Sequence, residues 1–209
     1  MLFGLFRYCF SYSLRLFAVM LAVCVVDSPA LFAQATAAAQ RSADLSVFGL
    51  YTRLTPDYGP QQNNGVMFGV DYTRNVRWWV QPSVEFRVKI ANGPTVDEKT
   101  YGGGIRAVKK INNFTPYADF MISEGLINLH LRNPPLLADG TPYTSDTSIV
   151  YHYGGGLDYH LTGNFSARGD FQFEKWRLDK YVPSLYKPID LAPTGWSLGV
   201  VYSIPFGRR

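Results

Sequence analysis

Cysteine is almost absent from this chain of 209 residues: the two that occur, Cys9 and Cys24, lie near its beginning. Arg7 and Arg15 precede an apolar stretch at 16–26, and Ala33-Gln34-Ala35 follows it. A positive start, a short apolar region and an Ala-x-Ala site form the pattern of a secretory signal peptide, so we predict a signal peptide at 1–35. The mature chain then has no cysteine, which excludes disulfides, thiol catalysis and thiolate metal sites.

Long apolar runs are also lacking beyond the predicted signal peptide, which excludes a helical membrane span there. Charged residues make up only 17% of the chain against 47% hydrophobic residues, and this balance argues against disorder. The net charge of +4 is spread among acidic residues and forms no basic cluster. We therefore expect no nucleic-acid partner.

The apolar residues alternate with polar or small ones from Asp44 onward, with the period of two that is typical of strands. Each alternating segment has roughly the ten residues that a tilted strand needs to cross a bilayer. In the clearest segment, 76–90, Pro82 predicts a bulge or a local loss of pairing because it has no N–H to donate. The segments are 44–54, 65–74, 76–90, 98–109, 114–125, 148–161, 164–177 and 194–206.

The connections between these segments alternate in length. Short ones follow every second segment, at Asn75, 110–113 and 162–163, whereas the other connections are longer. Short turns at one rim and long loops at the other are typical of outer-membrane barrels. We predict an all-β fold: an eight-stranded antiparallel up-and-down transmembrane β-barrel at 44–209, after a short lead-in at 36–43. The longer connections are 55–64, 91–97, 126–147 and 178–193.

The two faces of the segments differ in chemistry. One face carries aromatic residues near the segment ends, as expected of two girdles at the membrane surfaces: Tyr72, Trp78, Tyr101, Tyr151, Phe165, Phe173, Trp196 and Phe206. The other carries charges of both signs, which we interpret as an ion network that plugs a narrow lumen: Glu85, Arg87, Arg106, Asp119, Asp158, Arg168, Asp170 and Glu174. A soluble, lipocalin-like periplasmic barrel with the two faces exchanged remains an alternative.

Glycines at 102, 104, 154 and 156 fall on the polar face. We expect them to relieve crowding in a narrow lumen or to mark bends of the strands.

Two further patterns resemble a known family. Residues 197–206 have a polar residue, a glycine two positions later, and then apolar or aromatic residues at alternate positions, although the chain continues to Arg209. Tyr-Gly-Gly-Gly occurs at 101–104 and 153–156, with Pro-Tyr-Ala at 116–118 between them. This combination resembles the small opacity-type or OmpA-like barrels of bacterial outer membranes, without the peptidoglycan-binding domain of full-length OmpA. The resemblance implies contact with outer-membrane lipids and lipopolysaccharide, and recognition of the last strand by the outer-membrane assembly machinery.

Candidate catalytic residues are few. Some small outer-membrane barrels deacylate lipid A through a His-x-Ser motif, and neither His152 nor His160 is followed by such a serine. These two histidines share a face with Asp158 but lie about 26 Å apart along one strand, too far to share a metal. We predict no catalytic, cofactor or metal site. A lipid A- or phospholipid-modifying enzyme remains an alternative.

A second candidate is the polar series Asp170, Gln172 and Glu174, with Trp176. We expect its acidic members to pair with Arg168, Arg106 or Arg87, including a contact between Arg106 and Glu174. Proton or cation conduction by this series is the alternative to a structural network. The third candidate is the loop 126–147, because exposed loops on a rigid scaffold often bind ligands. The sequence thus favours a non-enzymatic structural or surface-interaction protein that binds an extracellular ligand through this loop.

Overall fold

The computed structural model describes residues 41–57, 61–130, 132–137, 139–178 and 189–208. The predicted signal peptide, its cleavage site and both cysteines lie outside these residues. No helix in the described part is long and apolar enough to cross a membrane.

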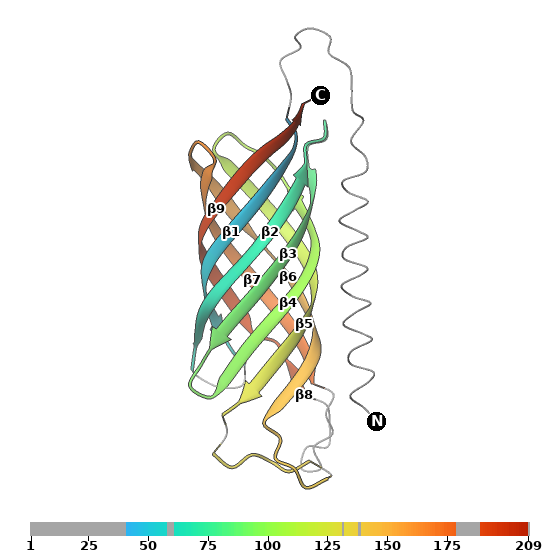
Figure 1. Cartoon of the computed structure of the whole chain (residues 1–209), viewed down its shortest axis with the longest axis vertical. Helices are drawn as coiled ribbons and strands as arrows, with labels where there is room; N and C mark the ends of the chain where they lie inside the picture. Colours follow the sequence, from blue (N-terminus) through green and yellow to red (C-terminus); the bar gives the residue numbers. More distant parts are fainter. Residues whose placement is uncertain (1–40, 58–60, 131, 138, 179–188, 209) are drawn as a thin grey trace. The chain divides into compact units, whose positions relative to one another are not determined.

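Antiparallel strands form one closed ring (Figure 1). Neighbours in the sequence pair with each other, β9 pairs with β1 and β7, and the pairing of β6 with β7 completes the closure. The all-β, eight-stranded barrel is therefore confirmed, with β8 as a short addition. The strands are β1 (Arg41–Thr55), β2 (Asn63–Arg74), β3 (Gln81–Asn92), β4 (Val96–Val108), β5 (Phe114–Leu129), β6 (Ser145–Thr162), β7 (Phe165–Leu178), β8 (Ile189–Leu191) and β9 (Thr194–Arg208).

The short strand β8 continues the line of β9 along β7, in the same register. The break between them falls at Ala192 and Pro193, where the proline has no N–H for the ladder. The Ala192 N–H donates instead to the Asp57 carboxylate, at 2.8 Å. This contact ties the connection that precedes β9 to the connection between β1 and β2.

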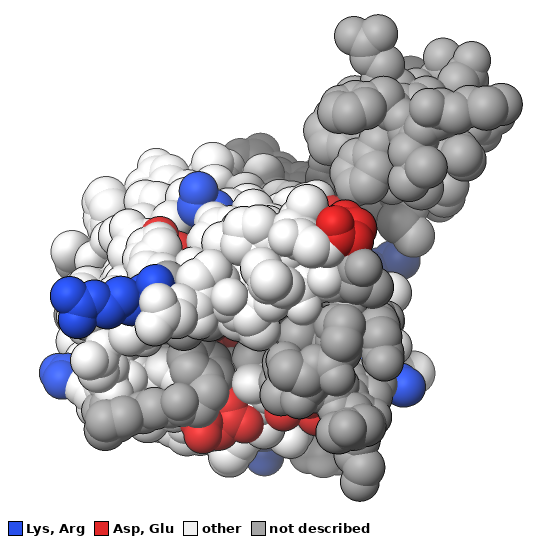
Figure 2. Space-filling model, turned by 90° about the horizontal axis from the view of Figure 1, so that it is seen from below, with Lys and Arg blue, Asp and Glu red and all other residues white. Residues whose placement is uncertain are grey.

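The outward side chains are mostly apolar and the inward ones largely polar. In β3, for example, Val84 is 52% exposed whereas Glu85 and Arg87 are each 4% exposed. Figure 2, a view from the long-loop end, shows Lys and Arg side chains at several points around the edge. Inward charges and outward apolar side chains are the reverse of what a soluble, lipocalin-like barrel requires, so that alternative is wrong.

Several predicted boundaries need correction. β3 begins at Gln81 and not at 76, so Trp78 lies in a six-residue turn at 75–80. The connection between β3 and β4, expected to be long, is only the tight turn 93–95, where Gly93 and Pro94 supply turn chemistry. β5 and β6 extend further than expected, so the loop predicted at 126–147 is 130–144, and β1 includes the last residues of the predicted lead-in.

The structure has no bulge at Pro82, but pairing is lost there on one side, because the ladder between β2 and β3 ends at Ser83. Pro82 is the second residue of β3 and pairs with Ala107 in an unbroken register. A proline at the start of a strand removes few of the hydrogen bonds between strands. The register shift that the structure does contain lies between His160 and Thr162, where β6 pairs with β7.

Inward glycines lie where the walls approach closely, as predicted. A Cβ added to Gly104 would lie 2.1 Å from the carbonyl oxygen of Phe120, and one added to Gly154 would lie 2.1 Å from that of Phe171. Neither position has room for a side chain without movement of the neighbouring backbone.

We therefore expect Gly104→Ala to destabilise the barrel by about 1–3 kcal/mol, because the neighbouring strand must shift. Urea unfolding in lipid vesicles measures this change. Gly169→Ala is the matched control, because a Cβ on this strand glycine meets only Leu198 Cδ1, at 4.0 Å. Equal stability of the two variants would show that the close approach has no energetic consequence.

Candidate functional site

The candidate site is the lumen, where inward side chains of all the long strands meet. Alternation along each strand sends every second side chain inward. The buried charged residues that take part in its ion pairs are Asp71, Glu85, Arg87, Lys89, Arg106, Asp119, Arg168, Asp170 and Glu174, with Asp158 more exposed at one side.

Two guanidinium groups hold the half of the lumen nearer the short turns. Arg106 Nη1 lies 2.8 Å from Asp71 Oδ2 and 3.0 Å from Glu85 Oε2. Arg168 donates to both oxygens of Asp158, at 2.6 and 2.8 Å, and to Asp71 Oδ2 at 3.1 Å. Asp71 thus receives two cations from strands that are far apart in the sequence.

Aromatic rings support these two guanidinium groups. The Tyr117 ring centroid lies 3.8 Å from Cζ of Arg106 and 5.2 Å from that of Arg168. The Phe48 ring lies 4.6 Å from Arg168 on the β1 side. Since desolvated cation–π contacts stabilise by about 2 kcal/mol, these rings offset part of the cost of burying the charges.

Arg87 forms a second centre, farther toward the long loops. Its Nε donates to Glu85 Oε1 at 2.6 Å, and its Nη2 donates to Asp119 Oδ2 at 3.1 Å. Its Nη1 lies 3.7 Å from Asp170 Oδ1. The Gln172 amide donates to Asp119 and to Asp170, at 3.0 and 3.2 Å, and so joins the two carboxylates.

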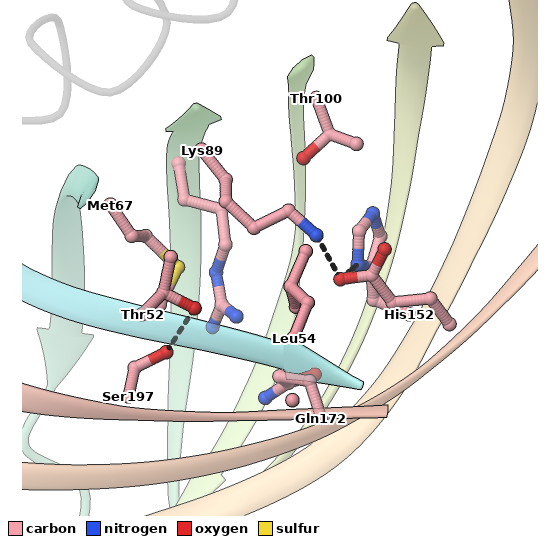
Figure 3. Close-up of a pocket in the computed structure, with 11 residues that line it drawn as sticks. Thr52, Leu54, Met67, Lys89, Thr100, His152, Gln172 and Ser197 are labelled. Carbon is pink, nitrogen blue, oxygen red and sulfur yellow. Dashed lines mark hydrogen bonds and ion pairs between the residues drawn. The ribbon is translucent and has the colours of Figure 1, made fainter. Parts of the chain in front are cut away.

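The third centre is the Glu174 carboxylate. It forms an ion pair with Lys89, it lies 3.6 Å from His152 Nδ1, and it accepts a hydrogen bond of 3.0 Å from Trp176 Nε1. A cavity of about 10 Å³ beside it has room for about one water molecule. Figure 3 shows Lys89 and His152 directed into this space, and the Thr52 and Ser197 hydroxyls joined by a hydrogen bond in its wall.

An apolar layer closes the lumen at the long-loop end. Trp176 is 1% exposed and packs with side chains of β4, β5, β6, β7 and β8. The layer comprises Val96, Ile127, Val150, Trp176, Leu178 and Leu191. The Glu174 centre is therefore covered on the side that faces the long loops.

The opposite end of the lumen is open. A polar cavity of about 260 Å³ lies at the short-turn rim, with Arg106 and Asp71 in its wall. At its mouth Lys110 donates to Asp44 at 2.6 Å and to Asn75 at 2.9 Å. At this rim the lumen is thus a polar recess.

The structure brings all eight residues of the predicted ion network into the lumen, but the predicted contact between Arg106 and Glu174 is wrong. Arg106 lies in the half of β4 nearer the short turns, and Glu174 lies nearer the long-loop end of β7, so they sit at different heights. Three partners were missed: Asp71, Lys89 and His152. The alternating pattern places each of them on the polar face, so this pattern could have predicted their part in the network.

The predicted girdle residues differ in where they lie and in how exposed they are. Tyr101, Tyr151, Phe165, Phe173 and Trp196 lie on strands and are each 41–49% exposed. Tyr72 is half-buried near the end of β2, and the side chain of Phe206 lies outside the described part of the chain. Trp78 lies in a turn and is 79% exposed. Stacked pairs such as Tyr153–Phe173, with centroids 5.4 Å apart, line the outer surface.

Among the described residues, no group of three or more His, Cys, Asp or Glu side chains is arranged to hold a metal ion.

We expect Lys89→Met to destabilise the barrel by about 3–5 kcal/mol, because it leaves the buried Glu174 carboxylate without its cation. The double variant Lys89→Met/Glu174→Gln removes both charges and should recover a large part of this loss. Urea unfolding in lipid vesicles measures both, and Lys99→Met, on the exposed face of β4, serves as the control. If the double variant were no more stable than Lys89→Met, the Lys89–Glu174 pair would not be what stabilises this layer.

Comparison with known proteins agrees with this architecture. The family model described as "Outer membrane protein beta-barrel domain" matches residues 18–203. Similar solved structures include the Neisserial surface protein A, with 16% identity, a TM-score of 0.48, and coverage of 77% of this chain and 96% of that chain. Another is the attachment invasion locus protein Ail of Yersinia pestis, with 18% identity, a TM-score of 0.43, and coverage of 78% and 97%.

A third similar structure is a major outer membrane protein of Thermus thermophilus, with 13% identity, a TM-score of 0.46, and coverage of 78% and 99%. These similarities are ones of fold and add nothing about ligands or activity. No curated protein matches the sequence. The family match covers nearly the whole barrel, and its strands, closure and apolar outer surface agree with it: the chain belongs to the outer-membrane β-barrel domain family and is a protein of the bacterial outer membrane.

Proposed function

We propose that this outer-membrane barrel is a closed, non-enzymatic scaffold that stabilises the envelope and interacts with an extracellular ligand through its long loops. The observation that supports the proposal is the filling of the lumen by side chains. Between its two ends lie the apolar layer around Trp176, the Glu174 centre and the two arginine centres.

The size of the barrel supports a closed lumen. Eight strands enclose a space that side chains fill, whereas aqueous porins have about twice that number of strands. In the half of the lumen beneath the long loops, the cavity of about 10 Å³ is too small for any solute larger than water. Solutes that enter from the short-turn rim meet the arginine centres.

The loop 130–144 is the best candidate for a surface that contacts other molecules, because hydrogen bonds hold it in a defined shape. The backbone N–H of Leu137 donates to the Thr141 carbonyl at 2.8 Å, and that of Tyr143 donates to the Pro135 carbonyl at 2.8 Å. Leu136 is 58% exposed beside this turn. Since an ordered loop loses less conformational entropy on binding, its shape favours recognition.

Tyr143 fastens this loop to the barrel. Its side chain is 2% exposed, and its hydroxyl donates to Asp146 Oδ2 at 2.9 Å. Burial and the neighbouring carboxylate raise the pKa of the Tyr143 hydroxyl well above its usual range. The hydroxyl therefore keeps its proton, and with it this hydrogen bond, throughout the physiological pH range.

The arrangement of the histidines favours a role without catalysis. His152 is buried beside Glu174, and His160 lines the cavity at the opposite rim. His130 lies at the loop end, 3.3 Å from Asp97. A nucleophilic triad needs a serine or similar nucleophile within hydrogen-bond reach of a histidine, and none of the three histidines forms such a contact among the described residues.

The expected partners follow from this location. The apolar outer face fits lipid chains and the lipid portion of lipopolysaccharide. β9 pairs with β1 along almost its whole length, so closure of the ring depends on this last strand. Recognition of β9 by the outer-membrane assembly machinery would fit this dependence.

Planar-bilayer recording tests the closed lumen. We expect the purified barrel to give no steady ionic current, because the apolar layer and the ion network leave no continuous aqueous path. The variant Trp176→Ala, which opens the layer beneath the long loops, should give brief current steps. A steady current from the wild-type barrel would overturn the proposal.

Limited proteolysis tests the order of the loop. We expect Tyr143→Phe to raise the rate of trypsin cleavage after the exposed Arg132 by about fivefold, since a lost hydrogen bond costs about 1 kcal/mol. Tyr151→Phe, on the exposed face of β6, is the control and should leave the rate unchanged. An unchanged rate for Tyr143→Phe would mean that this hydrogen bond does not hold the loop.

A further inference from the structure

The turn 75–80, between β2 and β3, carries two exposed tryptophans side by side in the sequence. Trp78 and Trp79 are each 79% exposed, more than any other large apolar side chain in the described part of the chain. Two large rings left in contact with water carry a high free energy, and exposed apolar patches of this kind commonly mark an interaction site. The barrel itself does not need them, because they lie outside the ladder.

The turn is held firmly at its first residue. The Asn75 N–H donates to the Ser42 carbonyl at 2.9 Å, and its side-chain amide donates to Asp44 Oδ2 at 3.1 Å. Lys110, from the neighbouring turn between β4 and β5, donates to Asn75 Oδ1 at 2.9 Å. These hydrogen bonds fix the start of the turn that carries the two tryptophans.

Cations accompany the two rings. Lys109 Nζ lies 5.5 Å from the Trp79 ring centroid, and Arg77 is exposed next to Trp78 in the sequence. Neither 74–80 nor 109–114 contains an acidic residue. We name Arg77, Trp78, Trp79 and Lys109 the Trp-turn patch; its charge is positive, and its rings are amphipathic.

The position of the patch along the barrel axis indicates what it contacts. Aromatic pairs lie on the lipid-facing surface at the same short-turn rim: Phe114 with Tyr159, and Phe165 with Tyr202, each with centroids 5.0 Å apart. The Trp-turn patch continues this rim over β2, β3 and β4. Indole rings favour the boundary between lipid chains and water, and lysine and arginine near a membrane surface are attracted to anionic headgroups.

We propose that the Trp-turn patch binds the phosphate groups of anionic phospholipids in the leaflet at the short-turn rim, with both indole rings inserted at headgroup level. The charge of the patch complements the phosphate, and the rings offer apolar area next to the lipid chains. Selection of anionic phospholipid by a turn goes beyond the general contact of a barrel with lipid, and it does not depend on the loop function proposed above.

Fluorescence quenching in nanodiscs tests this proposal. The probes are phosphatidylglycerol and phosphatidylcholine, each carrying a nitroxide just below the headgroup. We expect spin-labelled phosphatidylglycerol to quench tryptophan emission at about one thirtieth of the lipid fraction that phosphatidylcholine needs, since each of the two surface cations contributes about 1 kcal/mol. Added salt should reduce this difference.

Two variants assign the effect to the patch. Trp78→Phe/Trp79→Phe should remove the preferential quenching, because neither remaining tryptophan lies at the short-turn rim. Trp176 is buried in the lumen, and Trp196 lies on the outer face near the opposite rim. Arg77→Gln/Lys109→Gln should keep the rings and abolish the preference for phosphatidylglycerol. Arg132→Gln, in the loop 130–144, is the control and should change nothing.

Three results would overturn the proposal. One is equal quenching of the wild type by the two lipids, and another is a preference that survives Arg77→Gln/Lys109→Gln. The third is fluorescence of Trp78 and Trp79 that aqueous acrylamide quenches and that neither spin-labelled lipid quenches. That result would assign the patch to a protein partner instead.

Discussion

The outer face of each long strand contacts hydrocarbon, and the rest of the structure depends on this condition. Because lipid offers no hydrogen bonds, the backbone groups must pair between strands, and the ring has to close through β1 and β9. Because side chains alternate, an apolar outer face leaves the polar residues facing inward. Eight strands enclose little more than side-chain volume, so the charges that face inward satisfy one another rather than bulk water.

The ion pairs of the lumen connect walls that are distant in the sequence. Arg168 on β7 reaches Asp71 on β2, and Arg87 on β3 reaches both Asp119 on β5 and Asp170 on β7. A slip of one residue in any of these strands would turn its charged side chains toward lipid, where they are costly. The network therefore favours a single register around the whole ring, in addition to whatever stability its pairs contribute.

The two ends of the barrel differ in how side chains fill the lumen. Beneath the long loops the strands β5 and β6 continue past their neighbours, and apolar side chains such as Trp176 fill the space that they enclose. At the short-turn rim the inward residues are small or polar, and a recess remains. The turns at that rim carry the Trp-turn patch, whereas the braced loop 130–144 lies at the other end. The barrel thus offers different chemistry to the two sides of the membrane.

The sequence by itself determined the strands and their faces, because a period of two reports directly which side of a sheet a residue occupies. It placed Asp71, Lys89 and His152 on the polar face along with the predicted network. It misjudged the stretch 76–80, since alternation continues through a turn whether or not a neighbouring strand is there to pair with it. Only the tertiary structure decided which cation meets which carboxylate: Arg106 pairs with Asp71 and Glu85 because the tilt and stagger of the closed strands set the height of each side chain, and no local pattern contains that information.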